Sequence, residues 1–330
     1  MASWYSMWTQ FFPPKPQFGE RDLPDLSNRV YIVTGANTGL GKELSRVLYS
    51  KNAKVYLTAR TRAKAEAAIA DIQAAEPNSS GTLAFLQLNL EDLTTIEASA
   101  EKFLQCESRL HGLFLNAAYM GPGGDIERTK QGYEMHLGVN CLGTFLFNKI
   151  LTPVLLATTK DPETPPNSVR VIFMSSFAAE AFAEKDVGID MNNLDYHDKK
   201  SIHYRYGISK VGNWAYAVEF SKRYKNDGVI GVPLSPGILQ SELFRRQSYL
   251  YRLLISPFFY PIINGVRAQL WAGFSPEITV ESAGSYVVAF GRFLPIRADL
   301  KAATKSKAEG GNGTAQLFWD WSDEQVKKFL

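Results

Sequence analysis

The sequence has little cysteine, and its cysteines and histidines do not form an arrangement typical of a metal site. Only two cysteines occur in 330 residues, Cys106 and Cys141, and both lie in stretches that we predict to be helical. The four histidines are scattered without the spacing of metal ligands. We therefore expect neither a disulfide framework nor a zinc site, and a reducing compartment fits this composition.

A strong charge of one sign and long apolar runs are also missing. The chain carries 36 basic and 33 acidic residues, a net charge of +3, with no basic block, so we expect no nucleic-acid partner. No uninterrupted apolar run reaches the ~18 residues that span a bilayer. The aromatic N-terminus, residues 1–16, lacks the basic start and apolar stretch of a signal peptide. These absences predict a cytoplasmic protein with soluble ligands.

What the sequence does contain suits one large α/β domain. With 45% hydrophobic residues the chain can bury a large core. Continuous apolar runs alternate with helical stretches, which is the pattern of a doubly wound parallel sheet. We predict a single Rossmann-type domain with about seven strands, the last of them at residues 286–290.

A glycine-rich turn, residues 34–41, follows the first predicted strand at 30–33 and precedes a helix. Strand, turn and helix in this order place a pyrophosphate on a helix N-terminus, and glycine lets the backbone approach the phosphates. The turn therefore predicts a dinucleotide site. The residues expected to contact the phosphates are Gly35, Asn37, Thr38, Gly39, Leu40 and Gly41.

The end of the second strand, at 54–58, bears on the choice of dinucleotide. Ala59 and Arg60 follow it, where an NAD-binding protein would carry a carboxylate for the ribose 2′-hydroxyl. An arginine accommodates the 2′-phosphate of NADP instead, so Arg60 predicts NADP (NADPH). The alternative is a solvated arginine that starts a helix over 61–76. Further cofactor contacts are expected after the third and fourth strands, at Asn89, Leu90, Asn116 and Ala117.

Candidate catalytic side chains gather at the same strand ends. Tyr206 and Lys210 stand four residues apart, so they face the same way on a predicted helix, and a neighbouring positive charge lowers the pKa of a phenol. The fifth strand delivers Ser176. Asn140 lies near the centre of a predicted helix over 133–156, where a catalytic and a purely structural role are both open. A chance surface pair is the alternative for Tyr206 and Lys210.

A substrate lid is predicted late in the chain. Residues 250–266 are rich in leucine, isoleucine and aromatics and are interrupted by prolines, which suits an apolar lid at about 241–266 or, alternatively, a patch resting on a membrane surface. Just before it, Gly237, Ile238 and Ser241 follow the sixth strand, where we expect the nicotinamide. The expected parts of the chain are an N-terminal extension (1–28), a catalytic domain (29–295) and a tail with a short helix (296–330).

Taken together, these motifs resemble the short-chain dehydrogenase/reductase family over residues 29–295. The residues that carry the resemblance are Gly35, Gly39, Gly41, Asn116, Asn140, Ser176, Tyr206, Lys210 and the Pro236-Gly237 turn. The wide gap between Ser176 and Tyr206 and the runs at 209–213 and 286–288 are similar to the retinol-dehydrogenase-like branch, particularly its fungal members. Two departures concern cofactor packing: residues 115–118 read Leu-Asn-Ala-Ala instead of Asn-Asn-Ala-Gly, and Asn89 replaces an aspartate.

The resemblance implies an NADP-dependent oxidoreductase that passes hydride between the nicotinamide and a carbonyl carbon. Tyr206 would donate the proton and Ser176 would stabilise the developing charge on oxygen. Lys210 would hold the nicotinamide ribose and lower the pKa of Tyr206, while Asn140 would position a water. The family commonly forms homodimers through the helices that contain Tyr133 and Tyr204.

The expected substrate is a lipophilic ketone, aldehyde or alcohol, and we expect the setting to be secondary metabolism. One alternative is a catalytically silent NADP-binding regulator, because one fold hosts several functions. Another is a protein or reductase associated with a membrane surface. Its anchor would be the 250–266 segment or the aromatic residues Trp4, Tyr5, Trp8, Phe11 and Phe12.

Overall fold

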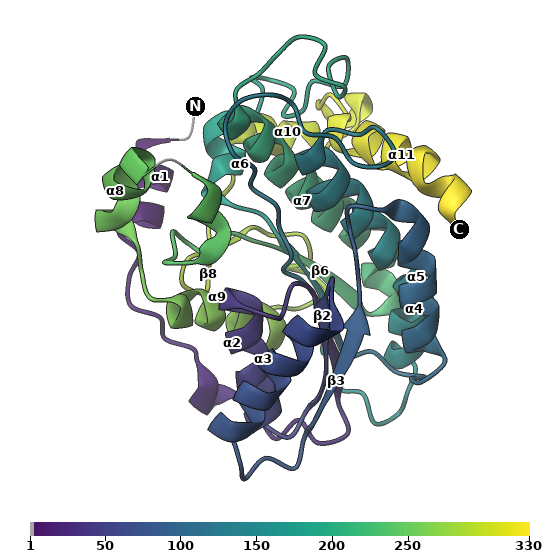
Figure 1. Ribbon diagram of the computed structural model, residues 1–330. Helices are drawn as coiled ribbons and strands as arrows, with labels where there is room; N and C mark the ends of the chain where they lie inside the picture. The colour runs from purple at the N-terminus through teal and green to yellow at the C-terminus, as the bar shows by residue number, and fades with distance from the viewer. Residues whose placement is uncertain (1–2, 248) are drawn as a thin grey trace.

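The computed structural model describes residues 3–247 and 249–330, which are built around an eight-stranded sheet (Figure 1). The strands are β1 (Val30–Val33), β2 (Lys54–Ala59), β3 (Thr82–Gln87), β4 (Gly112–Leu115), β5 (Val169–Met174), β6 (Val229–Leu234), β7 (Val287–Val288) and β8 (Arg292–Phe293). Their order is β3-β2-β1-β4-β5-β6-β7-β8, and all neighbouring pairs are parallel except β7 with β8. The predicted doubly wound α/β sheet is therefore confirmed.

The far edge of the sheet differs from the prediction in detail. The pattern predicts a seventh strand over 286–290, but this strand spans only two residues, and the chain then turns at Gly291, whose φ of +93° lies in the region that favours glycine. It returns as β8, also two residues long. Two-residue strands have no periodicity, so the sequence pattern does not reveal the eighth strand.

Helices cover both faces of the sheet, which is why its central strands are buried along their whole length. Along β5, Val171 and Phe173 point into one core and Ile172 and Met174 into the other. The helices, drawn in Figure 1, are α1 (Trp4–Phe11), α2 (Gly39–Ser50), α3 (Arg62–Ala75), α4 (Ile96–Leu104), α5 (Thr144–Thr159), α6 (Phe177–Phe182), α7 (Ile202–Tyr224), α8 (Tyr249–Ile255), α9 (Ile262–Phe274), α10 (Ala298–Ala303) and α11 (Thr314–Val326). The short turns of 3-10 helix are η1 (Glu20–Asp22), η2 (Leu93–Thr95), η4 (Lys225–Asp227), η5 (Glu242–Arg246), η6 (Ser256–Phe258), η7 (Lys307–Glu309) and η8 (Lys327–Phe329).

The helix predicted over 133–156 begins later and in a different form. Its first part, η3 (Leu137–Gly143), is a π-helical segment, and α5 continues from it. Single π-helical turns inside helices are frequent at functional sites, and this one contains Asn140. The combined segment Leu137–Thr159 is long and apolar enough to cross a membrane, contrary to the expectation from uninterrupted runs, but 72% of its most apolar window is buried inside the protein. Its apolarity therefore serves the core.

The predicted lid divides into two parts with different roles. The first part forms α8 and η6, in which no residue is fully buried. From Ile262 onward the chain forms α9, and Val266 on this helix is completely buried in the core between the sheet and α2. Residues from 262 onward are therefore not part of the predicted lid, because they pack in the core under the sheet. The lid role of the residues before them stays a prediction.

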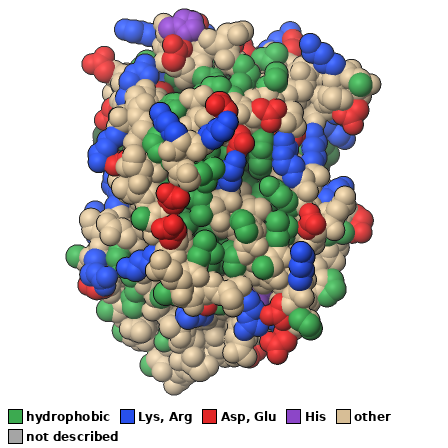
Figure 2. Space-filling view, turned by 90° about the vertical axis from the view of Figure 1, so that its right-hand side faces the viewer, with side chains coloured by type: hydrophobic (Ala, Val, Ile, Leu, Met, Phe, Trp, Pro, Cys, Tyr) green, Lys and Arg blue, Asp and Glu red, His purple; other side chains and the backbone are tan. Residues whose placement is uncertain are grey.

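The tail predicted over 296–330 contains the C-terminal helix α11, which packs on α7 and α5. The Tyr216 hydroxyl lies 2.6 Å from the Ser322 Oγ, Phe318 stacks on Tyr216, and Lys149 pairs with Asp323. Figure 2 shows this side of the molecule, where charges of both signs are mixed with apolar side chains. A homodimer through the Tyr133 and Tyr204 helices stays a prediction, and α11 already covers part of that surface.

Candidate active site

A cavity of about 940 Å³ lies at the carboxyl ends of the parallel strands. This is the edge at which open α/β sheets bind their ligands. Ser176, Tyr206 and Lys210 line the cavity. The predicted cofactor residues that line it are Gly35, Asn37, Thr38, Gly39, Leu40, Arg60, Asn89, Leu90, Asn116, Ala117, Gly237, Ile238 and Ser241. Gly41 and Asn140 do not line the cavity but pack directly behind its wall.

The glycine turn has the geometry that its sequence predicts. Gly35 and Gly39 have φ values of +65° and +57°, a backbone conformation that other residues rarely adopt. At Gly41 a Cβ would lie 2.6 Å from the Gly35 carbonyl oxygen and 2.7 Å from the Asn116 side chain. Gly41 therefore lets α2 approach β4 and the turn closely, while the first two glycines shape the turn itself.

The altered residues after β4 still tie the strand ends together. The Asn116 side chain donates to the Thr34 carbonyl at 3.0 Å, and the Ala117 N–H donates to the Thr34 Oγ1 at 2.9 Å. Gln269 of α9 in turn donates to the Asn116 Oδ1 at 3.1 Å. The departure from the family pattern at 115–118 therefore leaves the wall of the cavity fixed by hydrogen bonds.

Arg60 lies at the end of the cavity beside β2, with its side chain 55% exposed. Its guanidinium donates to Glu91 at 2.5 Å, and the Asn89 Oδ1 accepts from the Glu91 N–H at 3.2 Å. Lys64, one turn into α3, lines the cavity close by. Sequence reasoning missed Glu91 and Lys64. The usable signal would have been a second cation, Lys64, in the first turn of the helix that follows Arg60.

Tyr206 is 8% exposed and hydrogen-bonds to the Ser176 side chain. The N-cap Ser201 accepts from the Tyr204 N–H and starts α7, which carries Tyr206 into the wall. Burial raises the pKa of Tyr206 above its ordinary value. The net direction is therefore opposite to the expected one, because desolvation is the largest influence on the phenol. The contribution of Lys210 to this pKa stays a prediction.

The Lys210 ammonium lies 5.5 Å from the centre of the Tyr206 ring and donates to the Met174 carbonyl at 3.0 Å. Burial lowers the pKa of Lys210 to about 8. Asn213 donates to the same Met174 carbonyl at 3.1 Å, and the Ser175 Oγ donates to the Lys210 carbonyl at 2.9 Å. These bonds fix the end of β5 against α7, so Ser176 and Tyr206 keep their relative positions.

Asn140 is fully buried and its side chain is occupied by three hydrogen bonds. Its amide donates to the Tyr119 carbonyl at 3.0 Å and to the Ser209 Oγ at 2.9 Å, and its Oδ1 accepts from the Tyr119 N–H at 2.7 Å. Of the two roles left open by the sequence, the structural one therefore fits the Asn140 side chain. The Asn140 side chain is bonded to the loop at Tyr119. Its predicted role in positioning a water beside Lys210 stays a prediction.

A buried hydrogen-bonded pair, His136 with Glu134, lies behind Tyr206 and was not found by sequence reasoning. The His136 Nδ1 lies 2.6 Å from the Glu134 Oε1, and both side chains are at most 2% exposed. The Gly121 N–H donates to the His136 Nε2 at 3.3 Å, so Nδ1 carries the ring proton and donates it to Glu134. The His136 ring stands edge-on to Tyr206 at 6.1 Å. The pair therefore supports the loop and the ring that bound the cavity.

The other end of the cavity is lined by aromatic rings from distant parts of the chain. Phe11 of α1 packs edge-on against Phe177 at 5.2 Å and against Phe258 at 5.4 Å. His203, one turn before Tyr206, stacks with Phe182 and lies 5.0 Å from the Tyr251 ring. Its Nε2 is buried without a hydrogen-bond partner among the described residues, and burial lowers the pKa of His203.

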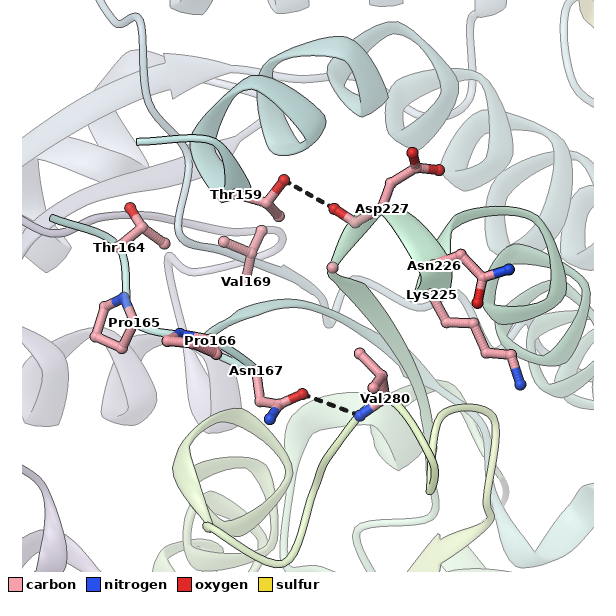
Figure 3. Close-up of a pocket in the computed structure, with 11 residues that line it drawn as sticks. Thr159, Thr164, Pro165, Pro166, Asn167, Val169, Lys225, Asn226, Asp227 and Val280 are labelled. Carbon is pink, nitrogen blue, oxygen red and sulfur yellow. Dashed lines mark hydrogen bonds between the residues drawn. The ribbon is translucent and has the colours of Figure 1, made fainter. Parts of the chain in front are cut away.

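A second cavity, of about 580 Å³, lies at the opposite edge of the sheet, where β5 and β6 begin (Figure 3). Turns line it, and hydrogen bonds hold those turns together. The Thr159 hydroxyl donates to the Asp227 carbonyl at 2.8 Å, and the Val280 N–H donates to the Asn167 side chain at 3.0 Å. None of the predicted site residues lines it.

The fold agrees with comparisons to known proteins. The family model for short chain dehydrogenases matches residues 29–185. The Short-chain dehydrogenase/reductase bet4 of Neocamarosporium betae is 49% identical, over 98% of this chain and 94% of the relative. A Short-chain dehydrogenase/reductase of Phomopsis amygdali is 48% identical, over 98% and 97%. The chain therefore belongs to the short-chain dehydrogenase/reductase family.

The fold is shared more widely than the sequence. A crystal structure of a protein from Mycobacterium paratuberculosis has a TM-score of 0.65, 22% identity, and coverage of 94% of this chain and 97% of that one. The relatives from Neocamarosporium betae and Phomopsis amygdali are fungal proteins, as the sequence motifs predicted. The narrower assignment to the retinol-dehydrogenase-like branch stays a prediction.

Proposed function

We propose that the protein is an NADPH-dependent oxidoreductase that interconverts a lipophilic ketone or aldehyde and its alcohol, in the cytoplasm and in secondary metabolism. One observation carries the proposal. Ser176, Tyr206 and Lys210 share the wall of a single cavity that has the glycine turn at one end and a group of aromatic rings at the other. A dinucleotide and an apolar substrate would meet at these three side chains.

The residues present fit a nicotinamide dinucleotide. The turn from Gly35 to Gly39 faces the cavity at the start of α2, where backbone N–H groups and the helix dipole favour a pyrophosphate. An ammonium has three donors, and the hydrogen bond from the buried Lys210 to Met174 uses one of them. Further donors of this ammonium suit ribose hydroxyls. When bound, the nicotinamide would supply or accept the hydride.

Tyr206 and Ser176 would handle the proton and the charge on oxygen. Because the pKa of Tyr206 is raised, its hydroxyl is protonated at neutral pH and ready to donate to the oxygen of a carbonyl as hydride arrives at carbon. The Ser176 Oγ would donate a second hydrogen bond to the same oxygen. The Ala178 N–H donates to that Oγ at 3.2 Å and orients it. The Lys210 charge nearby would stabilise the phenolate left behind.

Arg60 and Lys64 support the choice of NADPH over NADH. Two cations beside β2 suit a 2′-phosphate, and Ala59 leaves the position without a carboxylate that would favour NAD. Glu91 pairs with Arg60, so a phosphate would compete with this carboxylate for the guanidinium. We therefore expect a limited preference for NADPH over NADH, and this preference should increase when the charge of Glu91 is removed.

The experiment that tests the proposal follows the oxidation of NADPH by absorbance with paired carbonyl compounds, one lipophilic and one small in each pair. We expect turnover with lipophilic members and much less with small ones, and a lower Kd for NADPH than for NADH. A protein that binds NADPH tightly but consumes it with none of the compounds would instead be the silent regulator. Equal affinity for the two dinucleotides would mean that Arg60 is only a solvated residue at the start of a helix.

A further inference from the structure

Helix α1 has its polar and apolar faces the opposite way round from a helix on a water-exposed surface. Its fully buried residues are polar: Ser6 is 3% and Gln10 is 2% exposed. Its most exposed residues are aromatic, with Trp4 at 70%, Tyr5 at 68% and Trp8 at 53%. A surface helix in water normally turns its apolar stripe to the core. The outward face of α1 therefore has the composition of a face that meets an apolar surrounding.

This orientation of α1 is held by specific bonds. The buried Glu180 carboxylate of α6 accepts from the Ser6 Oγ at 2.6 Å and from the Gln10 Nε2 at 2.6 Å. Arg292 donates to the Thr9 carbonyl at 2.6 Å, and the Tyr260 hydroxyl donates to the Phe11 carbonyl at 3.1 Å. A charge-assisted anchor of this kind fixes which side faces out. The aromatic residues of α1 are thus exposed because these hydrogen bonds fix the orientation of the helix on the protein.

The C-terminal helix shows that the same chain can place aromatics inward. On α11, Phe318 is fully buried against Tyr216, and Trp319 packs against Phe145, while Gln316 and Asp320 face solvent. This is the ordinary arrangement for a terminal helix on a protein surface. The reversed arrangement of α1 therefore needs a separate reason.

Helix α8 extends the exposed apolar surface. Tyr249 is 79% exposed, Leu250 64% and Leu254 66%, and Leu253 also faces outward. The η6 turn that follows α8 brings Phe258 against Phe11 and Phe12 of α1, at 5.4 and 6.1 Å, and Figure 1 draws α1 and α8 in the same corner of the molecule. We define the outer face by these residues: Trp4, Tyr5, Trp8, Phe12, Tyr249, Leu250, Leu253 and Leu254.

Charge distinguishes the outer face from a face built for an arbitrary protein partner. Helices α1 and α8 contain no acidic residue, and their single charged side chain is the exposed Arg252. Lys15, just beyond α1, is also exposed. Tryptophan and tyrosine prefer the membrane–water interface, and a cation such as Arg252 is attracted to anionic headgroups.

We propose that the outer face docks on a lipid bilayer, with α1 and α8 lying in the interface as peripheral helices. The inner sides of the same elements line the cavity, through Phe11, Tyr251, Ile255 and Phe258. The two helices therefore separate the bilayer from the aromatic end of the cavity. Resting on the function proposed above, the docked enzyme takes its lipophilic substrate from the membrane, while the glycine turn stays accessible to NADPH from the aqueous side.

The test is sedimentation of the full-length protein with vesicles, either of zwitterionic lipid alone or containing anionic lipid, in the absence of substrate. The variant replaces Trp4, Trp8, Leu250 and Leu254 with serine. The matched control is Leu317→Ser, which removes a 55% exposed leucine from α11, far from the outer face in sequence and element. We expect the wild type and the control to sediment with vesicles, more strongly with anionic lipid. The variant's partition coefficient should fall at least about tenfold, because several interfacial side chains are lost.

Folding is checked by NADPH titration of each protein, and a single Leu254→Ser variant provides a milder step with a smaller fall. Wild-type protein that stays in solution with both vesicle types overturns the proposal. So does a control that loses binding as much as the variant. A molar mass in lipid-free solution that is twice that of one chain, and that the variant halves, assigns the outer face to a second copy and also overturns it. Vesicle binding is measured without turnover, so an inactive protein that sediments would contradict the proposed function alone.

Discussion

The two ends of the active-site cavity differ in how the chain builds them. The cofactor end comes from turns that directly follow β1, β2, β3 and β4, and a parallel sheet brings such turns to one edge by its topology. The end proposed for the substrate is assembled from three separate stretches of the chain, which are α1, the region of α6 and α7, and α8 with η6. It depends on tertiary contacts such as the bonds from Ser6 and Gln10 to Glu180. The first end follows from the topology of the sheet, whereas the second depends on contacts between separate elements.

The largest expected effect lies at the boundary between the two ends. Tyr206→Phe should lower kcat by ~10²–10⁴, the usual contribution of a general acid, while the Kd for NADPH and the KM for substrate change little. Steady-state kinetics and a cofactor titration measure these quantities. Near-normal turnover in this variant would show that Tyr206 is not the proton donor, and the reactive group between the two ends would then be unknown.

A pH effect at Lys210 should come next in size. Its folded pKa is about 8 against an ordinary value of 10.5, so between these values the unfolded chain binds more protons and the free energy of unfolding rises with pH. From pH 8 to 10 we expect a gain of roughly 2–3 kcal/mol relative to Lys210→Met, at 1.36 kcal/mol per pKa unit. Denaturant unfolding of both cofactor-free proteins measures it. Parallel curves for the two would show that Lys210 is not neutralised by burial.

The cofactor end should respond to a paired substitution without affecting the substrate end. Ala59→Asp with Arg60→Ile removes a charge-assisted contact worth ~1.5–3 kcal/mol and adds a carboxylate that repels the 2′-phosphate. NADPH binding should weaken by about 10- to 150-fold and NADH binding should improve. Calorimetric titration with each dinucleotide measures the change. A parallel loss for NADH and NADPH would mean that the turn itself was damaged, and Arg62→Ile, in the first turn of α3, is the matched control.

The smallest expected effect concerns the substrate end. Phe11→Ala and Phe258→Ala each remove a ring from the cavity wall, so the KM for bulky lipophilic substrates should rise by about tenfold and that for small substrates by less. The Kd for NADPH should not change. Point substitutions suit this test better than a deletion over 250–263, because residues from Ile262 onward belong to the core helix α9. Equal effects on both substrate classes would show that the rings support the fold and not the substrate.

The difference between the two ends also explains what the sequence could predict. The alternation of strands and helices, the glycine turn and the positions of Ser176, Tyr206 and Lys210 follow local rules, in which a turn or a helix comes directly after a buried strand. Arg60 is located in the same way. These signals need no knowledge of which distant segments touch.

The remaining features depend on contacts between residues that the sequence does not bring together. The anchor of α1 joins Gln10 to Glu180 across 170 positions, and no periodicity signals such a pair. The residues at 250–266 have one apolar composition, but the first part forms α8, which has no buried residue, and the last part belongs to the core helix α9. The pKa of Tyr206 depends on its burial, which a spacing of four residues to Lys210 does not reveal.

In the function proposed above, hydride transfer from a dinucleotide at the cofactor end to a lipophilic carbonyl at the substrate end would join the two ends into one site. The most direct measurement uses NADPH with deuterium at the transferable position of nicotinamide C4 and a lipophilic aldehyde that the protein turns over. We predict that mass spectrometry finds one deuterium on the carbinol carbon of the alcohol and that Tyr206→Phe forms this product far more slowly. Consumption of NADPH without deuterium in the alcohol, or no alcohol despite saturating NADPH binding, would contradict hydride transfer between the two ends.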